Sequence, residues 1–593
     1  MEGTTRRFLF ATLGAASIGF HLALVFSGLV PNLVARPVHL ILAIPWIFLF
    51  AAGNFRDLVV GATFTTAGVI CCAYIVINET VLAEQYGALQ GALQLVVSVT
   101  LVIVVLEMAR RAISWPLPLV AVFALAYGFF GEHIPGEFGH PGLPLESFLG
   151  TLTIAEGGLW GSLTGISVNI VAIFVILGAV LNAGEAGQGF MNLATAVAGR
   201  LKGGAAKVSL LSSALFGSIS GSASANVAST GAITLPAMRR LGYPRALAGA
   251  VEAVASSGGQ IMPPLMGAGA FVMVELTGIP YKNIVIAAFF PAILYFIAVW
   301  FGINAFCTRH QLSGLAPDDR PAIRTIAVTA LFFCVPFVIL LERMFRGGFT
   351  PQFAACVAIL TAFMMLFIDS RLSFSWSRSV LRLETVTINA GKQIAMIASI
   401  IVCASIIIGV LGQTGLGVKI TSLILSVSDD SIWPALFLTA CACLILGMEV
   451  PTTAAYVICV SVAGPALQSL GLAPLQAHLF IFWFALLSTI TPPVCGAVFI
   501  AASMVESNWL KVAGNAMLLG IGLYLIPMAM IVNPELIRLE TAPIPALVVA
   551  IKISFGLCAI SFGAIASKPL AIRLILLVAG LTVLFTPLAL KLQ

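Results

Sequence analysis

The sequence predicts an all-α polytopic membrane protein with about fifteen transmembrane helices and two re-entrant helical hairpins in inverted repeats. Three observations lead to this expectation: the composition, the length of the apolar stretches, and an internal repeat of glycine and proline. Of the 593 residues, 60% are hydrophobic and only 9% are charged, whereas soluble domains carry about 25% charged residues. So few charges cannot cover several soluble domains, which excludes a cytosolic enzyme, a disulfide-stapled secreted protein and a disordered scaffold.

Many apolar stretches are long enough to cross a bilayer. A transmembrane helix needs about 20 predominantly apolar residues, and the mean hydropathy of the chain is +1.09. Two stretches, 205–241 and 432–470, are interrupted near their middles by Gly, Pro and Ser, so neither predicts one continuous helix. We expect spans near residues 12–32, 38–54, 57–77, 88–108, 113–132, 164–183, 246–275, 284–306, 325–342, 352–369, 393–412, 475–505, 511–532, 543–562 and 569–590.

Basic residues set the predicted orientation of this multi-pass chain. Arg6 and Arg7 precede the first span, and they place the N-terminus in the cytoplasm because loops rich in Lys and Arg stay on that side. No Lys or Arg occurs between Arg111 and Arg200, which predicts an outside segment in that interval. The net charge of +6 includes no basic run of five, so we expect contact with a lipid bilayer and not with nucleic acid.

The two interrupted stretches share a skeleton of glycine and proline. Counting from Gly217, the first stretch has its marker residues 19, 25, 27 and 46 positions later, at Pro236, Gly242, Pro244 and Pro263. Counting from Gly447, the second has them 18, 24, 27 and 45 positions later, at Pro465, Gly471, Pro474 and Pro492. About five spans separate the two units, and an odd number gives them opposite orientations. Inverted repeats with broken helices indicate the binding site of a secondary transporter.

The residue types at the interruptions suit ligand binding. The first interruption, 217–226, is rich in serine, and the second, 447–453, contains two threonines. Freed backbone carbonyls with Ser, Thr and Asn oxygens form a neutral cage for Na⁺, and the ends of half-helices offer N–H groups to an anion. Close helix packing by small residues is the alternative. Two clusters at repeat-related positions, each followed by a Pro-Pro pair, favour binding.

Two acidic residues inside apolar stretches are candidates for proton coupling. Glu252 lies in the predicted span 246–275, and Glu449 lies in the second interruption. Ionisable groups at membrane depth are costly and are functional candidates by default. For Glu252 the alternative stays open that its carboxyl bonds to Ser or Thr and only fixes helix packing.

At these residues the chain resembles the permeases of TRAP transporters, specifically the fused type that works with TAXI-family solute receptors. The resemblance rests on residues 213–275, 411–417 (LGQTGLG), 447–456 (GMEVPTTAAY) and 477–494, and it covers most of the chain. The first four spans resemble the small Q-type subunit and the remainder resembles the large M-type subunit. The resemblance divides the chain into a Q-like four-helix scaffold domain (1–112), an M-like domain whose transport core holds the hairpins 205–241 and 432–470 (113–540), and C-terminal transmembrane helices (541–593).

The resemblance implies uptake of a small organic acid across the bacterial inner membrane by an elevator mechanism. A gradient of Na⁺ or H⁺ would drive transport without any other cofactor, and a periplasmic TAXI-type binding protein would deliver the substrate. Glu449 departs from the family, in which a small residue is common at that position, and residues 165–171 also differ. The family's cation- and substrate-binding positions fall on Ser220, Ser222, Ser224, Asn226, Ser257, Gly258, Gln260, Thr452, Thr453, Thr489 and Thr491.

Other classes of function fit the sequence less well than transport. A channel needs a continuous water path, which two interruptions approached from opposite faces do not predict. The sequence contains no HExxH or GxSxG motif and its six histidines are scattered, so neither an enzyme nor a metal site other than one for Na⁺ is expected. The absence of GxxxxGK[ST] disfavours an ATP-driven pump. A proton-coupled carrier that works without a receptor stays open.

Overall fold

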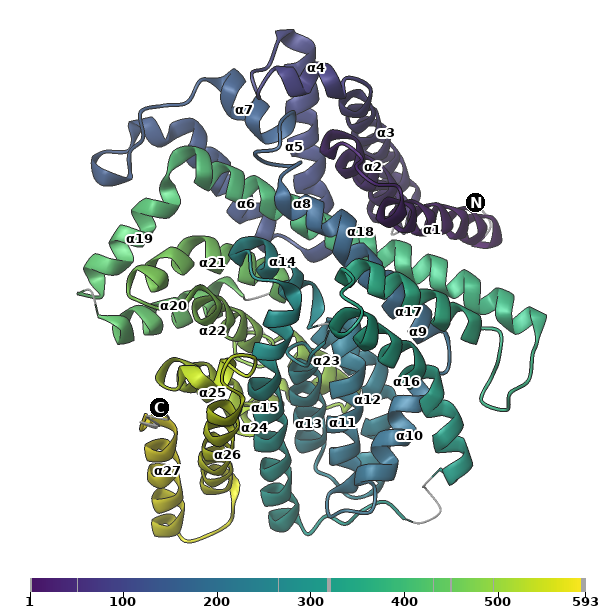
Figure 1. The fold of residues 1–593 in the computed structure, drawn as a ribbon, viewed down its shortest axis with the longest axis vertical. Coiled ribbons are helices and arrows are strands. Elements are labelled where there is room, and N and C mark those ends of the chain that lie inside the picture. Colours follow the sequence, from purple (N-terminus) through teal and green to yellow (C-terminus); the bar gives the residue numbers. More distant parts are fainter. Residues whose placement is uncertain are drawn as a thin grey trace. The chain divides into compact units, whose positions relative to one another are not determined.

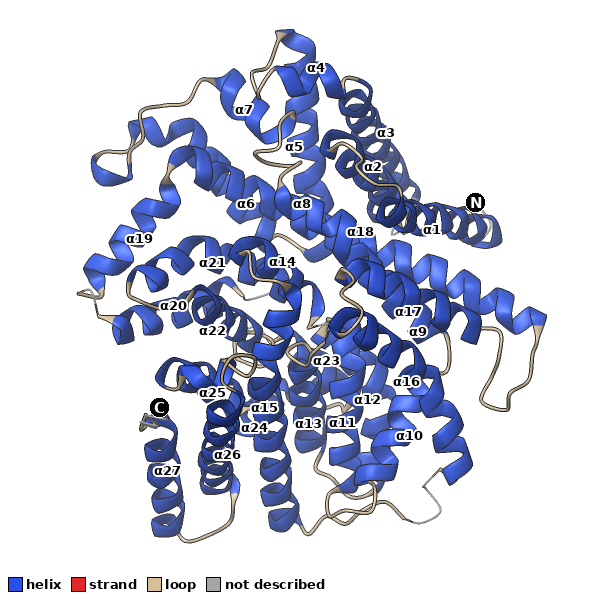
Figure 2. Ribbon diagram, viewed as in Figure 1, coloured by secondary structure: helices blue, strands red, loops and turns tan. Residues whose placement is uncertain are grey.

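The computed structural model describes residues 3–50, 52–264, 266–316, 321–429, 431–447, 451–493 and 495–587. These ranges form helices joined by short connections, and their only β-type pairing is an isolated bridge between Ile368 and Phe374 (Figures 1 and 2). The predicted helical class is therefore confirmed. The chain forms two compact units: unit 1 comprises Met1–Gly184, Pro336–Ser431 and Val460–Ala466, and unit 2 comprises Glu185–Val335, Ile432–Cys459 and Leu467–Gln593.

Unit 1 is organised around one long helix, α18 (Trp376–Thr414), which has 39 residues. This helix packs most extensively against α1, α2, α5, α6 and α9 and also contacts α7, α8 and α19. The π-helix η1 (Trp46–Phe50) extends α2, and the π-helix η4 (Ser167–Val171) joins α8 to α9. The other helices of unit 1 are α1 (Gly3–Phe26), α2 (Asn32–Pro45), α3 (Phe55–Ile77), α4 (Glu79–Glu84), α5 (Gly91–Ile113), α6 (Pro116–Phe130), α7 (Leu145–Thr153), α8 (Ser162–Ile166), α9 (Ala172–Ala183), α17 (Pro351–Met365) and α19 (Leu416–Val427).

Two buried histidines join α1, α2 and η4 inside unit 1. His21 Nε2 lies 2.7 Å from His39 Nδ1, and His39 Nε2 lies 3.1 Å from Ser167 Oγ. His21 Nδ1 is 2.6 Å from the Ser17 carbonyl oxygen. Each ring nitrogen therefore has a partner, as buried polar groups require, and the chain of hydrogen bonds fixes the three elements together.

Unit 2 contains the first interrupted stretch and most of the second, whose residues 460–466 belong to unit 1. Two helices, α16 (Ile323–Phe345) and α21 (Thr452–Ser469), contribute residues to both units. The helices that lie within unit 2 are α10 (Ala186–Ala198), α11 (Gly204–Ser220), α12 (Ala223–Arg240), α13 (Arg245–Gly259), α14 (Gly267–Thr277), α15 (Tyr281–His310), α20 (Ile432–Leu446), α22 (Pro474–Leu487), α23 (Gly496–Met504), α24 (Trp509–Leu519), α25 (Ile521–Val532), α26 (Pro543–Ile565) and α27 (Leu570–Phe585).

Fewer spans are found than the sequence predicts. Within the described residues, eleven helical segments are long and apolar enough to cross a membrane, against about fifteen expected. The predicted spans 246–275 and 475–505 are each divided into two helices at a Pro-Pro pair, which removes two amide donors from any continuing helix. The predicted spans 352–369 and 569–590 are helices of 15 and 16 residues, which are short for a full crossing.

Both interrupted stretches are broken where the sequence predicts a break. The stretch 205–241 forms α11 and α12, which separate at Gly221, a residue with φ of +62°. Glycine adopts this left-handed conformation without steric cost. The stretch 432–470 forms α20 and α21, and residues 448–450 between them, including Glu449, lie outside the described residues. Pro236 and Pro465 lie inside α12 and α21 rather than at the breaks.

The packing of α1 on α18 can be tested at two glycines of α1. A Cβ atom on Gly14 would lie 2.1 Å from the Thr387 carbonyl oxygen, whereas one on Gly19 would meet nothing within 4 Å. Close helix approach through small residues is a main source of stability in membranes. We expect Gly14→Ala to destabilise the protein by about 1–3 kcal/mol and to lower its unfolding temperature in detergent. Gly19→Ala is the control, and an equal loss in both variants would contradict this packing.

Candidate functional site

The internal repeat recurs as a close approach between corresponding helix ends in each half. In the first half, a Cβ on Gly217 of α11 would lie 2.5 Å from Gly259 Cα at the end of α13. In the second half, a Cβ on Gly447, which follows α20, would lie 2.9 Å from Ser488 Cβ, which follows α22. Gly217 and Gly447 start the two sequence skeletons, and Gly259 and Ser488 each precede a Pro-Pro pair by four residues. The repeat found in the sequence is therefore also a repeat of packing.

In each half, the short helix after the Pro-Pro pair packs against a helix of the other half. The short helix α14 that follows the first Pro-Pro pair packs against α22 of the second half, where Gly269 approaches the Phe482 ring. The short helix α23 that follows the second Pro-Pro pair packs against α13 of the first half, where Gly249 approaches Val505 and the Ala501 carbonyl. Such reciprocal contacts are the pattern of two halves related by a local two-fold axis.

A single glutamine connects the two halves at the breaks. Gln260 Nε2 donates to the Gly221 carbonyl oxygen over 2.9 Å, and Thr452 Oγ1 donates to Gln260 Oε1 over 3.0 Å. The two side chains are 6% and 9% exposed. Gly221 also lies against Gly267, since a Cβ on Gly221 would be 2.7 Å from Gly267 Cα. We call this group of Gly221, Gln260, Gly267 and Thr452 the Gln260 junction.

Helix N-termini meet at and beside this junction. Helix α12 starts directly after Gly221, with Ser222 as its N-cap accepting from the Ala225 amide over 3.3 Å. Gly267 is the first residue of α14, and Thr452 is the first residue of α21. Close by, Ser224 Oγ lies 3.6 Å from the place of a Cβ on Gly496, the first residue of α23. Four positive helix ends are thus brought near one another.

Another pair of predicted site residues meets across the repeat. Ser257 Oγ lies 2.9 Å from Thr489 Oγ1, and Ser257 is fully buried while Thr489 is half-buried. Gly258 is held against the ring of Tyr295, which a Cβ at that position would enter. The ends of α13 and α22 are therefore joined by hydroxyl groups one turn away from Gln260.

The remaining predicted residues have other surroundings. Asn226 is fully buried and donates to the Ser213 carbonyl oxygen over 2.9 Å. Thr491 Oγ1 lies 2.7 Å from the Tyr524 hydroxyl. Thr453 is half-buried in the first turn of α21. The side chain of Ser220 and all of Glu449 lie outside the described residues.

Glu252 lies away from the Gln260 junction, in a cage of hydroxyl groups. Its carboxyl is fully buried between α11, α12 and α13. Sequence reasoning missed the five residues of this cage, although Ser209 and Ser213, Thr230 and Thr234, and Glu252 and Ser256 are each four residues apart, on one helix face. Thr230 and Thr234 donate to the carboxyl, Ser209 donates over 2.7 Å, and Ser256 and Ser213 lie at 3.4 and 3.5 Å.

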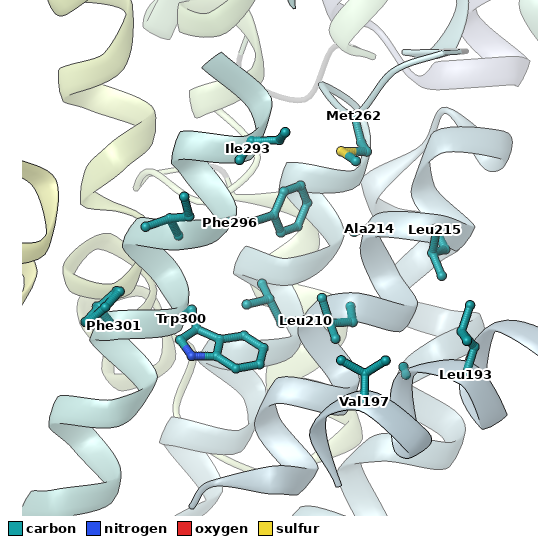
Figure 3. A pocket seen from close by; sticks show the side chains of 13 residues that line it. Leu193, Val197, Leu210, Ala214, Leu215, Met262, Ile293, Phe296, Trp300 and Phe301 are labelled. Atoms are coloured by element: carbon teal, nitrogen blue, oxygen red, sulfur yellow. The ribbon is translucent and has the colours of Figure 1, made fainter. Parts of the chain in front are cut away.

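An apolar pocket of about 550 Å³ also occurs in unit 2, and it differs in character from the junction. Figure 3 shows Ile293, Phe296 and Trp300 projecting into it from α15, with Leu210 and Leu215 on the facing helix α11. Its lining is hydrophobic, apart from the indole nitrogen of Trp300. Such a lining suits an apolar group and not a charged ligand.

The chemistry available at the junction is binding rather than catalysis. Its side chains are a neutral amide and hydroxyls, and the described residues contain no group of three or more His, Cys, Asp or Glu that could hold a metal ion. Oxygen atoms at helix C-termini can coordinate a cation, and N–H groups at helix N-termini can hold an anion. Broken helices that meet in this way define the class of secondary membrane transporters.

Comparison with known proteins supports this class. The sequence profile of the family described as "Tripartite ATP-independent periplasmic transporter, DctM component" matches residues 100–544. The chain therefore belongs to the DctM family of TRAP transporters. It is a polytopic inner-membrane transporter permease and not an enzyme. Permeases of this family work with periplasmic substrate-binding proteins and are typically ion-coupled.

Three relatives illustrate the range of the family. The protein YgiK of Salmonella typhimurium is 24% identical over 371 residues, which is 62% of this chain and 83% of the relative. The C4-dicarboxylate TRAP transporter large permease protein DctM of Pseudomonas aeruginosa is 26% identical over 337 residues, 56% of this chain and 76% of the relative. The sialic acid TRAP transporter large permease protein SiaM of Vibrio cholerae is 22% identical over 386 residues, 65% of this chain and 88% of the relative.

The contribution of Gln260 to the stability of the protein can be measured directly. Gln260→Leu removes the donor to the Gly221 carbonyl and the acceptor for Thr452, and an unpaired buried polar group costs about 1–3 kcal/mol. We expect a lower unfolding temperature of the purified protein in detergent. Gln188→Leu is the control, because Gln188 is exposed and bonds only to Asn192 on its own helix. A Gln260 variant as stable as the Gln188 variant would contradict the junction.

Proposed function

We propose that this chain takes up a small organic acid across the bacterial inner membrane by secondary active transport. A cation gradient, of Na⁺ or H⁺, drives the uptake, and a periplasmic substrate-binding protein of the TAXI type delivers the substrate. The observation that carries the proposal is the Gln260 junction, where one side chain bonds to the first break at Gly221 and to the start of α21 at Thr452.

The helix ends around the junction favour an anionic substrate. Four helices begin there, at Ala223, Gly267, Thr452 and Gly496, and each presents a positive dipole end. Helix N-termini are ready-made sites for carboxylates. The substrates that the names of two relatives give, a C4-dicarboxylate and sialic acid, are carboxylic acids. A carboxylate bound at these N-termini accounts for the neutral side chains of the site.

Hydroxyl and carbonyl oxygens beside the junction suit the coupling cation. Ser257 and Thr489 share a hydrogen bond at the ends of α13 and α22, where the last carbonyl groups of a helix carry partial negative charge. We assign cation and substrate binding to the residues of the two breaks and the two Pro-Pro turns: Ser220, Ser222, Ser224, Asn226, Ser257, Gly258, Gln260, Thr452, Thr453, Thr489 and Thr491.

The proposal also assigns a moving part and a scaffold to the two units. The two interrupted stretches form re-entrant hairpins in opposite orientations, and unit 2, which contains their breaks, is the part that moves in an elevator cycle. The Q-like residues 1–112, all within unit 1, belong to the scaffold, in a fused chain whose N-terminus faces the cytoplasm. The sequence resemblance and the compactness of the two units support this division.

Uptake should depend on the assigned side chains. In proteoliposomes supplied with the receptor, Asn226→Ala and Thr452→Val should reduce accumulation of radiolabelled substrate to the level of empty vesicles, because each removes a polar group at a break. Succinate and sialic acid are suitable first probes. Thr361→Val is the matched control, since the Thr361 hydroxyl bonds only to the Val357 carbonyl of its own helix in unit 1. Normal uptake by both site variants would refute the assignment.

The requirement for a receptor is a separate expectation. Vesicles that hold this chain alone should not accumulate substrate at low concentration, because selection and capture belong to the periplasmic protein. Addition of purified receptor should restore accumulation under an imposed cation gradient. Accumulation without receptor would identify a conventional carrier, and flux that no gradient can drive above equilibrium would identify a channel.

A further inference from the structure

Glu252 is buried without a charged partner. Its oxygens bond to hydroxyl groups, and a Cβ on Gly231 of α12 would lie 3.2 Å from its Cγ. Helix α13 packs against α11, α12, α15, α23 and α24, of which α23 carries no titratable group. The other four carry Lys207, Arg239, Arg240, Tyr281, Lys282, Tyr295, Cys307, Arg309, His310 and Lys511, and in the described part of the chain none of them bonds or pairs with Glu252.

The cage can satisfy both protonation states of the carboxyl. Thr230 Oγ1 lies within reach of Glu252 and also 2.8 Å from the Asn226 carbonyl oxygen. Thr234 Oγ1 lies within reach of Glu252 and also 3.0 Å from the Thr230 carbonyl oxygen. With an ionised carboxylate the threonine hydroxyls donate to it. With a protonated carboxyl one hydroxyl turns to its own helix carbonyl and accepts the new O–H, so no polar group is left unpaired.

The second half of the repeat shows that the fold does not require this acid. Pro263 corresponds to Pro492, and the same offset relates Glu252 to Ile481 and Thr230 to Cys459. Ile481 is fully buried and Cys459 is 2% exposed. Equivalent helix packing is thus achieved with apolar side chains in the second half, whereas a structural role alone does not explain a buried carboxyl in the first.

The cage is connected to the binding residues through one side chain. Thr230 Oγ1 lies 3.3 Å from Asn226 Oδ1, and Asn226 Nδ2 donates to the Ser213 carbonyl oxygen over 2.9 Å. Asn226 also packs against Gly217 and Gly259, the repeated contact behind the first break. A change in which acceptor Thr230 uses therefore changes the hydrogen bonds of Asn226.

We propose that Glu252 carries a coupling proton, an inference that rests on the proposed transport function. A proton from the outer solution binds to one carboxylate oxygen of Glu252. Thr230 then donates its hydrogen bond to Asn226, and the first break takes the arrangement that binds substrate. On the inner side the proton leaves to solvent, and the carboxylate again accepts from Thr230 and Thr234. One proton thus crosses with the substrate, and no other reactant is needed.

The first experiment needs no substrate. Infrared difference spectra of the purified full-length protein, recorded as the pH is lowered, should show the C=O band of a protonated buried carboxyl. Glu252→Gln should lose this band. The control Glu275→Gln should keep it, because Glu275 is exposed in α14 of the same unit. If Glu252→Gln keeps the band, the proposal is overturned.

The second experiment measures coupling with radiolabelled succinate in proteoliposomes with receptor. Glu252→Gln should lose accumulation driven by a pH gradient but keep exchange of internal for external substrate, which moves no net proton. Glu275→Gln should show both activities. Gradient-driven accumulation by Glu252→Gln, or wild-type uptake that follows Na⁺ alone, would overturn the role of Glu252 while leaving transport established. Absence of any wild-type uptake would instead count against the proposed function.

A second variant covers the case in which Glu252→Gln fails to fold. Thr234→Val keeps the side-chain shape but removes a donor to the carboxylate, which disfavours the ionised form. The pH at which the infrared band and pH-driven uptake are half-maximal should rise. Thr361→Val should leave both unchanged, and an unchanged pH dependence in Thr234→Val would contradict the assigned cage.

Discussion

The structure depends on one constraint: backbone groups that a broken helix leaves unpaired at membrane depth must find partners inside the protein. The Gly221 carbonyl at the first break is satisfied by the Gln260 amide, and Gln260 is satisfied in turn by Thr452. These bonds link three segments that are far apart in sequence. The polar side chains at the junction are therefore a direct consequence of how the breaks are stabilised.

The repeat separates what the fold needs from what the chemistry needs. Both halves keep a close approach before the Pro-Pro pair, Gly217 on Gly259 and Gly447 on Ser488, because the helices cannot approach as closely with larger residues. The side chains that surround this shared frame differ. Glu252 occurs in one half only, and the corresponding position of the other half is the buried Ile481. Symmetric packing thus supports an asymmetric site, and the differences between the halves point to the residues with a chemical role.

Sequence reasoning located the breaks but not their bonding. The breaks follow from local chemistry, since Gly at positive φ and paired Pro act on their immediate neighbours. The expected span 246–275 was wrong because its apolar length outweighed the Pro-Pro pair inside it. The partners of Gln260 and Glu252 could not be predicted, because they depend on how α11, α12, α13 and α21 pack. For Glu252, sequence reasoning left bonding to Ser or Thr open but named none of the hydroxyl groups that the structure places around the carboxyl.

In the proposed coupling, the distance between Glu252 and the junction gives the effect of protonation on anion binding the sign that symport requires. The two positions are eight residues apart along α13 and its C-cap, roughly 12 Å at the rise of a helix. At an effective dielectric constant of about 20, a carboxylate at that distance opposes an anion by about 1.4 kcal/mol, against about 4 kcal/mol at contact distance. Protonation removes this opposition and strengthens anion binding about tenfold. A carboxylate inside the junction would compete with the substrate for the helix N-termini, whereas a carboxylate in the hydroxyl cage would couple to substrate binding without occupying the substrate site.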